Sequence, residues 1–144
     1  MRVQNVYYCR AMDGLAEDAV RAEYGYLNAL LTKRGFRLVN AHNHERYEML
    51  PLNHNNAVKV VEENLDELKA SDYVIINFSI PNHLYVGCIG EMIYAKISNK
   101  RVIVIAGDSG VDKHFWTLYH ADALVKTLDE AIVQLELMRS DYNG

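Results

Sequence analysis

The sequence is poor in cysteine, and Cys9 and Cys88 are the two that it contains. Both stand in apolar stretches, so they provide no disulfide framework and are typical of a protein from a reducing compartment. No apolar run reaches the ~18 residues that a membrane-spanning helix needs. No apolar segment of the signal-peptide kind precedes the first predicted strand. We therefore expect a cytoplasmic protein without a membrane partner.

Lysine and arginine are somewhat fewer than aspartate and glutamate, which limits the possible ligands. The chain of 144 residues has a net charge of −4 at pH 7 and no dense stripe of lysine and arginine. This composition argues against a nucleic-acid-binding surface. No G-x-G-x-x-G motif follows the first apolar segment, which disfavours a dinucleotide-binding fold. What remains is an ordinary globular composition, long enough for one domain over residues 1–144 with a buried core.

Five segments have the composition of β-strands. Residues 3–9, 72–78 and 101–107 are nearly continuous runs of apolar residues, rich in β-branched and aromatic side chains. Such runs are typical of a parallel sheet that is covered on both faces. Two shorter candidates are residues 36–41 and 123–126.

Helical patterns alternate with these strands, at residues 16–34, 57–70, 90–98 and 128–139. This alternation predicts an α/β fold with right-handed crossovers. We expect a flavodoxin-like (Rossmann-like) doubly wound sheet of five parallel strands in the order 2-1-3-4-5, with helices on both faces. Ligands of such sheets bind at the carboxyl ends of the strands. The long irregular stretch 42–56 follows one of those ends, and loops of that length are often functional.

The segment G-C-I-G-E, residues 87–91, places a single acid among glycines and apolar residues. We expect Glu91 to begin the helix after the third strand, where the helix dipole and free N–H groups favour negative charge. That role explains a first-turn acid without any chemistry. Gly87 and Gly90, however, would let the backbone approach a ligand closely and leave the carboxylate facing the cleft. The residues alone leave both roles open.

The wider pattern around Glu91 resembles a known family. The strand D-Y-V-I-I-N-F is followed by G-x-x-x-E-M-I-Y-A and then by K-R-V-I-V-I, within residues 72–105. This order is similar to the signature of the nucleoside 2-deoxyribosyltransferase family. The segment V-Y-Y-C-R-A-M-D-G resembles that family's first strand and loop. V-N-A-H, residues 39–42, resembles its nucleoside 5′-monophosphate N-glycosidase (nucleotide hydrolase) branch, which releases the base from nucleotides.

By this resemblance Glu91 is the nucleophile, or it stabilises the oxocarbenium ion that forms at C1′. Cleavage leaves positive charge on the sugar, and a carboxylate beneath the anomeric carbon captures or stabilises it. Two positions depart from the family pattern. Asn64 replaces the catalytic aspartate that lies eight residues before strand three, so it can hydrogen-bond but cannot act as an acid. Tyr85 stands where transferases carry an aspartate for the 5′-hydroxyl and hydrolases a serine for the 5′-phosphate.

The resemblance implies further substrate-binding residues on the same rim of the sheet. The family packs base and sugar near the end of the first strand, where the guanidinium of Arg10 could clamp a phosphate. We expect His42 to line the base pocket and Arg46 to reach the phosphate. The aromatic stretch after the fourth strand reaches, in the family, into the neighbouring subunit's site. The expected substrate-binding residues are Tyr8, Arg10, Met12, Asp13, Gly14, His42, Arg46, Ser79, Tyr85, Gly87, Cys88, His114 and Trp116.

Each of these residue types also has an ordinary explanation. Tyr8 and the other aromatic residues can fill a core or an interface. Asp13 can form a turn, and residues 42–56 can be a polar surface loop. The pair His42 and His44 lacks the spacing of common metal sites. We therefore expect no metal and no other cofactor.

The sequence thus predicts an enzyme that cleaves the N-glycosidic bond of a nucleoside 5′-monophosphate. V-N-A-H favours a pyrimidine base, deoxy and modified forms included. Its partner would be a small nucleotide or nucleoside, and the family implies a homodimer or higher homo-oligomer with shared active sites.

Two alternatives stay open. One is a nucleoside 2′-deoxyribosyltransferase that exchanges bases. The other is a nucleotide-binding or sequestering protein of the same fold without catalysis, which Asn64 and Tyr85 would suit. A phospho-receiver domain is set aside, because the third strand ends in Asn77, Phe78 and Ser79 without an acid.

Overall fold

The computed structural model describes residues 2–12, 15–46 and 50–143, with the backbone alone at residues 46 and 140–143. The strands are β1 (Gln4–Cys9), β2 (Phe36–Leu38), β3 (Tyr73–Asn77), β4 (Arg101–Ile105) and β5 (Ala123–Val125). The α-helices are α1 (Glu17–Lys33), α2 (His54–Lys69), α3 (Val86–Ile97), α4 (Phe115–His120) and α5 (Leu128–Asn143). Two short 3-10 helices, η1 (Asn43–Arg46) and η2 (Val111–Lys113), lie in the connections.

The described strands form one parallel sheet in the order β2-β1-β3-β4-β5. Val6 of β1 pairs with both Leu38 of β2 and Tyr73 of β3, so β1 occupies the position next to the switch in strand order. The predicted five-stranded, doubly wound α/β fold is confirmed. Its switch point lies between β1 and β3, which is where such sheets bind ligands.

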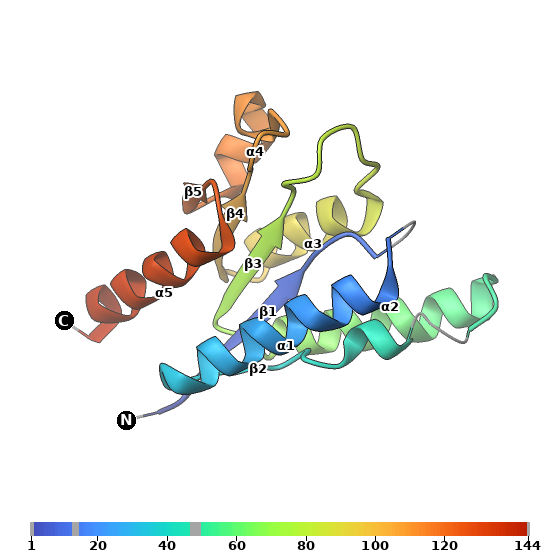
Figure 1. The fold of residues 1–144 in the computed structure, drawn as a ribbon, viewed down its shortest axis with the longest axis horizontal. Helices are drawn as coiled ribbons and strands as arrows, with labels where there is room; N and C mark the ends of the chain where they lie inside the picture. The colour runs from blue at the N-terminus through green and yellow to red at the C-terminus, as the bar shows by residue number, and fades with distance from the viewer. Residues whose placement is uncertain (1, 13–14, 47–49, 144) are drawn as a thin grey trace.

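Helices cover both faces of this sheet (Figure 1). On one face, α1 and α5 pack on side chains such as Val6, Tyr8 and Ile75. On the other, α2 and α3 pack on Tyr7, Cys9 and neighbouring strand residues. Because side chains alternate along a strand, Tyr7 and Tyr8 face opposite layers. Throughout the described ranges, no helix has the length and apolar character needed to cross a membrane.

Helix α3 begins earlier than the sequence indicated. The glycines in its first turns suggested a start near residue 90, whereas the helix runs from Val86 and has Tyr85 as its N-cap residue. Glycine weakens a helix by only about 1 kcal/mol relative to alanine, which tertiary packing overrides. The expectation that Glu91 begins the helix is therefore wrong. Glu91 lies in the second turn, and the first turn contains no acid.

The stretch 42–56 is also more regular than expected. It contains η1, and α2 begins at His54, three residues before the predicted start. The side chain of Asn53 accepts a hydrogen bond from the backbone N–H of Asn56 at 2.9 Å, which caps the helix. Beyond β4, the aromatic segment forms the short helix α4, which the sequence pattern did not predict.

Candidate active site

A pocket of about 130 Å³ opens at the carboxyl end of β1, between the loop that follows it and the start of α3. Residues from β1, α1, η1 and the segment before α3 contribute to its wall. The structure brings together seven of the residues that the sequence singled out, namely Tyr8, Arg10, Met12, Tyr85, Gly87, Cys88 and Glu91. They come from segments about 75 residues apart in the chain, so the parallel pairing of β1 with β3 is what assembles them.

Glu91 has its carboxylate held inside this pocket. The hydroxyl of Tyr7 donates a hydrogen bond to Glu91 Oε1 at 2.9 Å. The buried, free thiols of Cys9 and Cys88 lie beside it, with their sulfurs 2.8 Å apart. Burial raises the pKa of Glu91, hydrogen bonds from Cys9 and Tyr7 partly offset that rise, and the charge of Glu67 adds to it. The site therefore holds a desolvated carboxylate in a fixed orientation.

The N-terminus of α3 forms another part of the same wall. Val86, Gly87 and Cys88 line the pocket, and these first-turn residues have N–H groups without intrahelical partners. The N-cap residue Tyr85 makes no side-chain capping bond. Instead its hydroxyl accepts a hydrogen bond from the N–H of Ile80 at 3.0 Å. The positive end of the helix dipole thus faces the pocket, and the first turn of α3 itself contains no acid.

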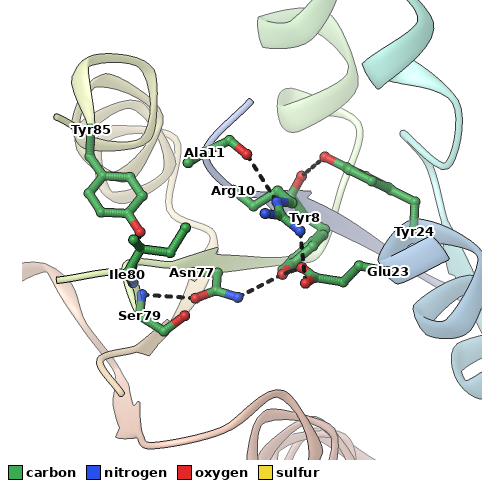
Figure 2. A network of polar contacts seen from close by, with 9 residues as sticks. All are labelled: Tyr8, Arg10, Ala11, Glu23, Tyr24, Asn77, Ser79, Ile80 and Tyr85. Atoms are coloured by element: carbon green, nitrogen blue, oxygen red, sulfur yellow. Dashed lines mark hydrogen bonds and ion pairs between the residues drawn. The ribbon is translucent and has the colours of Figure 1, made fainter. Parts of the chain in front are cut away.

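A chain of polar contacts supports the pocket from the α1 side (Figure 2). Asn77 donates to the hydroxyl of Tyr8 at 2.9 Å, and that hydroxyl donates in turn to a carboxylate oxygen of Glu23. Tyr24 donates to the backbone oxygen of Tyr8 at 3.2 Å. Burial, followed by the charge of Glu23, raises the pKa of Tyr8 well above its usual value. Tyr8 is therefore a neutral donor that connects β1, β3 and α1.

Arg10 belongs to the same network. Its Nη1 lies 2.8 Å from Glu23 Oε2, and its Nε donates to the backbone oxygen of Ala11 at 3.0 Å. The side chain is only 10 % exposed. The guanidinium thus neither faces solvent nor stands free to clamp a phosphate with both edges.

Other expected site residues lie elsewhere. His114 and Trp116 line a second pocket, of about 470 Å³, which shares Tyr85 with the first. His42 lies at a third pocket, beside β2, with Nδ1 3.5 Å from Glu45 Oε1. Ser79 and Asn64 are not among the described residues that line the Glu91 pocket. Ser79 donates its N–H to Asn77 Oδ1 at 2.9 Å, and Asn64 is buried on α2.

Three expected residues cannot be placed in this way. Asp13 and Gly14 lie outside the described residues, and so does the side chain of Arg46. Within the described ranges, no three His, Cys, Asp or Glu side chains gather in a way that could hold a metal ion.

Sequence reasoning missed several residues that act on Glu91 or line its pocket. Tyr7 could have been found by alternation, since it shares a strand face with Cys9 and so points toward α3. Glu67 lies one helical turn beyond Asn64 on α2 and acts on Glu91 through its charge. Tyr24 and Asn43, unlike Tyr7 and Glu67, line the pocket. No local pattern marked these last two, because their position depends on how α1 and η1 pack against β1.

The fold has clear counterparts among solved structures. A CMP N-glycosidase from Clostridium botulinum matches at 17 % identity and a TM-score of 0.59, covering 94 % of this chain and 99 % of that one. A 2-deoxyribosyltransferase from Leishmania mexicana matches at 16 % identity and a TM-score of 0.67, covering 91 % and 95 %. A 2-deoxyribosyltransferase from Bacillus psychrosaccharolyticus matches at 13 % identity and a TM-score of 0.64, covering 88 % and 89 %.

Sequence comparison alone finds no counterpart. No protein-family model matches the chain, and no curated protein matches it. The similarity therefore rests on the structure, over nearly the whole length of the chain. The chain has the fold of N-glycosidases and 2-deoxyribosyltransferases that act on nucleosides and nucleotides, the class of proteins that the Glu91 segment resembles.

Proposed function

We propose that this protein cleaves the N-glycosidic bond of a nucleoside 5′-monophosphate, with Glu91 as the nucleophile. The observation that carries the proposal is the desolvated Glu91 carboxylate, oriented by the hydroxyl of Tyr7 on the wall of a pocket. A purely structural acid gains nothing from this placement, because burial of its charge costs free energy. A nucleophile for an anomeric carbon needs it.

The reaction would proceed in two displacements. A Glu91 oxygen bonds to C1′ as the C1′–N bond breaks, and its electron pair leaves with the base, which takes up a proton. Water then attacks C1′ of the glycosyl ester, which releases the sugar phosphate and returns the carboxylate after loss of a proton. The pKa of Glu91 is raised by burial, so activity should fall as the pH drops through that pKa and the carboxylate becomes protonated.

The start of α3 supports a 5′-phosphate in preference to a 5′-hydroxyl. An uncapped helix N-terminus without a first-turn acid is suited to bind an anion. Gly87 leaves the backbone open there, because a Cβ at this position would meet no atom within 4 Å. Tyr85 then serves as the N-cap residue and a wall of the pocket, and the helix N–H groups take the place of the missing serine.

Base transfer is the second candidate, and two deoxyribosyltransferases among the similar structures favour it. A transferase returns the glycosyl group to a second base instead of to water. Hydrolysis and transfer differ in the acceptor alone, so one assay separates them.

The test is to incubate the protein with ribo- and deoxyribonucleoside monophosphates and to measure free base by chromatography, with and without an added acceptor base. We expect base release from a pyrimidine nucleotide, and its loss in Glu91→Gln. Glu62→Gln, which removes an exposed charge on α2, is the matched control. Full turnover by Glu91→Gln would rule out the mechanism. An upward melting shift with nucleotide but no base release would establish a binding protein instead.

We further propose that the protein self-associates through α3 and α4. Exposed apolar side chains concentrate on these helices and the segment before α3, namely Leu84, Val86, Ile97, Phe115, Trp116, Leu118 and Tyr119. An apolar surface of this kind is typical of an interface. Sedimentation should show a dimer or larger oligomer that Phe115→Glu dissociates and Leu137→Glu, an exposed position on α5, does not. A monomeric wild-type protein would refute this proposal.

A further inference from the structure

The thiols of Cys9 and Cys88 form a close pair on the wall of the Glu91 pocket. Their sulfur atoms lie 2.8 Å apart, although the two residues are 79 positions apart in the chain. Non-bonded carbon atoms pack at about 3.5–4.0 Å, and sulfur is the larger atom. The bond length of a disulfide is ~2.05 Å. The pairing of β1 with the start of α3 therefore holds two free thiols within a short movement of a covalent bond.

The pocket distinguishes this pair from ordinary core cysteines. A buried free cysteine usually serves as a small apolar side chain. Cys9 is 6 % exposed and Cys88 4 % exposed, and both line the cavity of about 130 Å³. A water-sized molecule needs only about 10–15 Å³ of such a volume. A small oxidant that enters the pocket can therefore meet the two thiols.

Cys9 also connects the pair to the carboxylate in the pocket. Burial raises the pKa of Glu91, hydrogen bonds from Cys9 and Tyr7 counteract that rise, and the charge of Glu67 on α2 adds to it. The sulfur of a disulfide carries no hydrogen to donate. Oxidation of Cys9 would therefore remove one of the donors that stabilise the ionised form of Glu91.

We propose that Cys9 and Cys88 are a site of reversible oxidation, at which a small hydroperoxide closes a disulfide and lowers the activity of the pocket. The disulfide itself does not depend on the proposed function, whereas its effect on activity rests on it. A transient, redox-sensing disulfide is the kind that proteins of a reducing compartment form.

The oxidation has two steps that balance in atoms and electrons. One thiol takes up an oxygen atom as the O–O bond of hydrogen peroxide breaks, which gives a sulfenic acid and water. The second sulfur then displaces hydroxide from the sulfenic acid, and the hydroxide leaves as water with the remaining thiol proton. Two thiols and one peroxide thus give one disulfide and two waters.

The surroundings of Cys9 assign the order of these steps. Burial, followed by the hydrogen bond with Cys88 and the charge of Glu91, raises the pKa of Cys9 well above its usual value. Since the thiolate is the form that attacks, Cys9 is the poorer first nucleophile. Cys88 therefore reacts with the peroxide, and Cys9 closes the bond.

The first experiment detects the bond without any substrate. The native protein is treated with hydrogen peroxide, quenched with catalase, unfolded and alkylated with N-ethylmaleimide, and its mass is measured with and without dithiothreitol. The chain contains two cysteines. We expect a species that takes up maleimide only after reduction, and a linked pair of peptides that contain Cys9 and Cys88. Two thiols that stay reactive, or a bond between separate chains, would overturn the proposal.

The unfolded chain is the matched control for the role of the fold. In guanidinium nothing holds the two thiols together, so the bond should form at least about tenfold more slowly than in the native protein. Single variants test the order of the steps. Cys9→Ser, which keeps Cys88, should lose its thiol to peroxide faster than Cys88→Ser, which keeps Cys9. Equal rates in the folded and unfolded chain would overturn the proposal, and equal rates in the two variants would overturn the order.

Activity shows what the bond does to the pocket. After peroxide treatment the wild type should release base about tenfold or more slowly at neutral pH, the loss expected for one hydrogen bond to a charged group. Dithiothreitol should restore the rate. The double variant Cys9→Ser/Cys88→Ser should keep, after peroxide, the rate that it had before. A loss that dithiothreitol does not reverse, or that the double variant shares, would come from oxidation elsewhere and would overturn the effect on activity.

A failure of the proposed function would be recognised separately. A protein that closes the bond but releases no base from any nucleotide would refute the proposed function and support the oxidation site, because the mass measurement involves no substrate. A protein that releases base but keeps both thiols under peroxide would refute the oxidation site alone.

Discussion

Removal of the Tyr7 hydroxyl is the sharpest test of how the pocket controls the ionisation of the Glu91 carboxylate. Tyr7 is fully buried and donates to Glu91 at 2.9 Å. Burial, followed by the charge of Glu91, raises the pKa of Tyr7 well above its usual value, so the phenol stays protonated as a donor. In Tyr7→Phe the ring remains and the hydrogen bond is lost. The ionised form of Glu91 then loses a stabilising contact that the protonated form needs far less.

The expected magnitude follows from the kind of bond that is lost. A hydrogen bond to a charged group contributes about 1.5–3 kcal/mol, and ~1.4 kcal/mol corresponds to a factor of ten in rate. We expect kcat/KM at neutral pH to fall by about 10-fold to 100-fold. The acid limb of the pH profile should move to higher pH, because the carboxylate becomes harder to ionise.

The assay is base release from a nucleoside monophosphate across the pH range, with Tyr73→Phe as the matched control. Tyr73 is a buried tyrosine whose hydroxyl donates to Gln4 Oε1 at 3.0 Å, on the opposite face of the sheet. The Tyr73→Phe variant should be less stable than the wild type, but the acid limb of its pH profile should not shift. An acid limb that stays in place in Tyr7→Phe would show that Tyr7 does not control the ionisation of Glu91.

The effect of the buried Glu91 charge on the stability of the folded protein can be checked without any substrate. The folded-state pKa of Glu91 is raised above its unfolded value by burial, so the folded state binds the proton more readily. The ionised group therefore costs stability at pH values above the folded pKa, and the cost disappears below the unfolded pKa. Glu91→Gln should be more stable than the wild type at neutral pH and equally stable in acid. Chemical denaturation at several pH values measures this, and a destabilised Glu91→Gln at neutral pH would contradict it.

Two further predictions concern glycines. Gly87→Ala and Gly90→Ala should each stabilise α3 by about 0.5–1 kcal/mol, since a Cβ meets nothing within 4 Å at either position. Of the two variants, only Gly87→Ala should raise KM, because Gly87 lines the pocket. Thermal melts and initial rates test this, and equal KM values would refute it. Gly107→Ala should lose about 2–4 kcal/mol, because its φ is +52° and the new Cβ would lie 2.8 Å from Ser79 Cβ. Gly110→Ala, with φ +82° but open space, should lose only ~1–2 kcal/mol in the same denaturation experiment.

The sequence predicted the sheet well because the signal for its strands is local. Near-continuous apolar runs mark β1, β3 and β4, and their alternation with helices leaves few possible strand orders. The local pattern also singled out Glu91, which the structure places in a pocket at the carboxyl end of β1. The start of α3 was not, because Gly87 and Gly90 are poor helix formers that packing against the sheet nevertheless holds in a helix.

Contacts between segments far apart in the chain explain the remaining differences between the expected and the observed site. Arg10 was expected to meet phosphate or solvent, and it pairs instead with Glu23 of α1, a residue 13 positions away in the chain. The histidine expected at the base, His42, is turned to another pocket, while Asn43 lines this one. Asn43 lies between the two pockets and lines both, whereas His42 lines only the one beside β2. No pattern of residue types within the segment encodes this placement, which depends on how the segment packs after β2.

The orientation of the α3 N-terminus toward the pocket has a consequence for how nucleotide affinity depends on ionic strength. Among the described pocket-lining residues, Arg10 is the only lysine or arginine, and its charge is already matched by Glu23. A phosphate would then be held by aligned backbone N–H groups instead of by a mobile cation. Salt screens charges that are exposed to solvent far more than contacts made inside a pocket. Nucleotide affinity should therefore change little between low and physiological salt, which sets this site apart from those built on surface arginines and lysines.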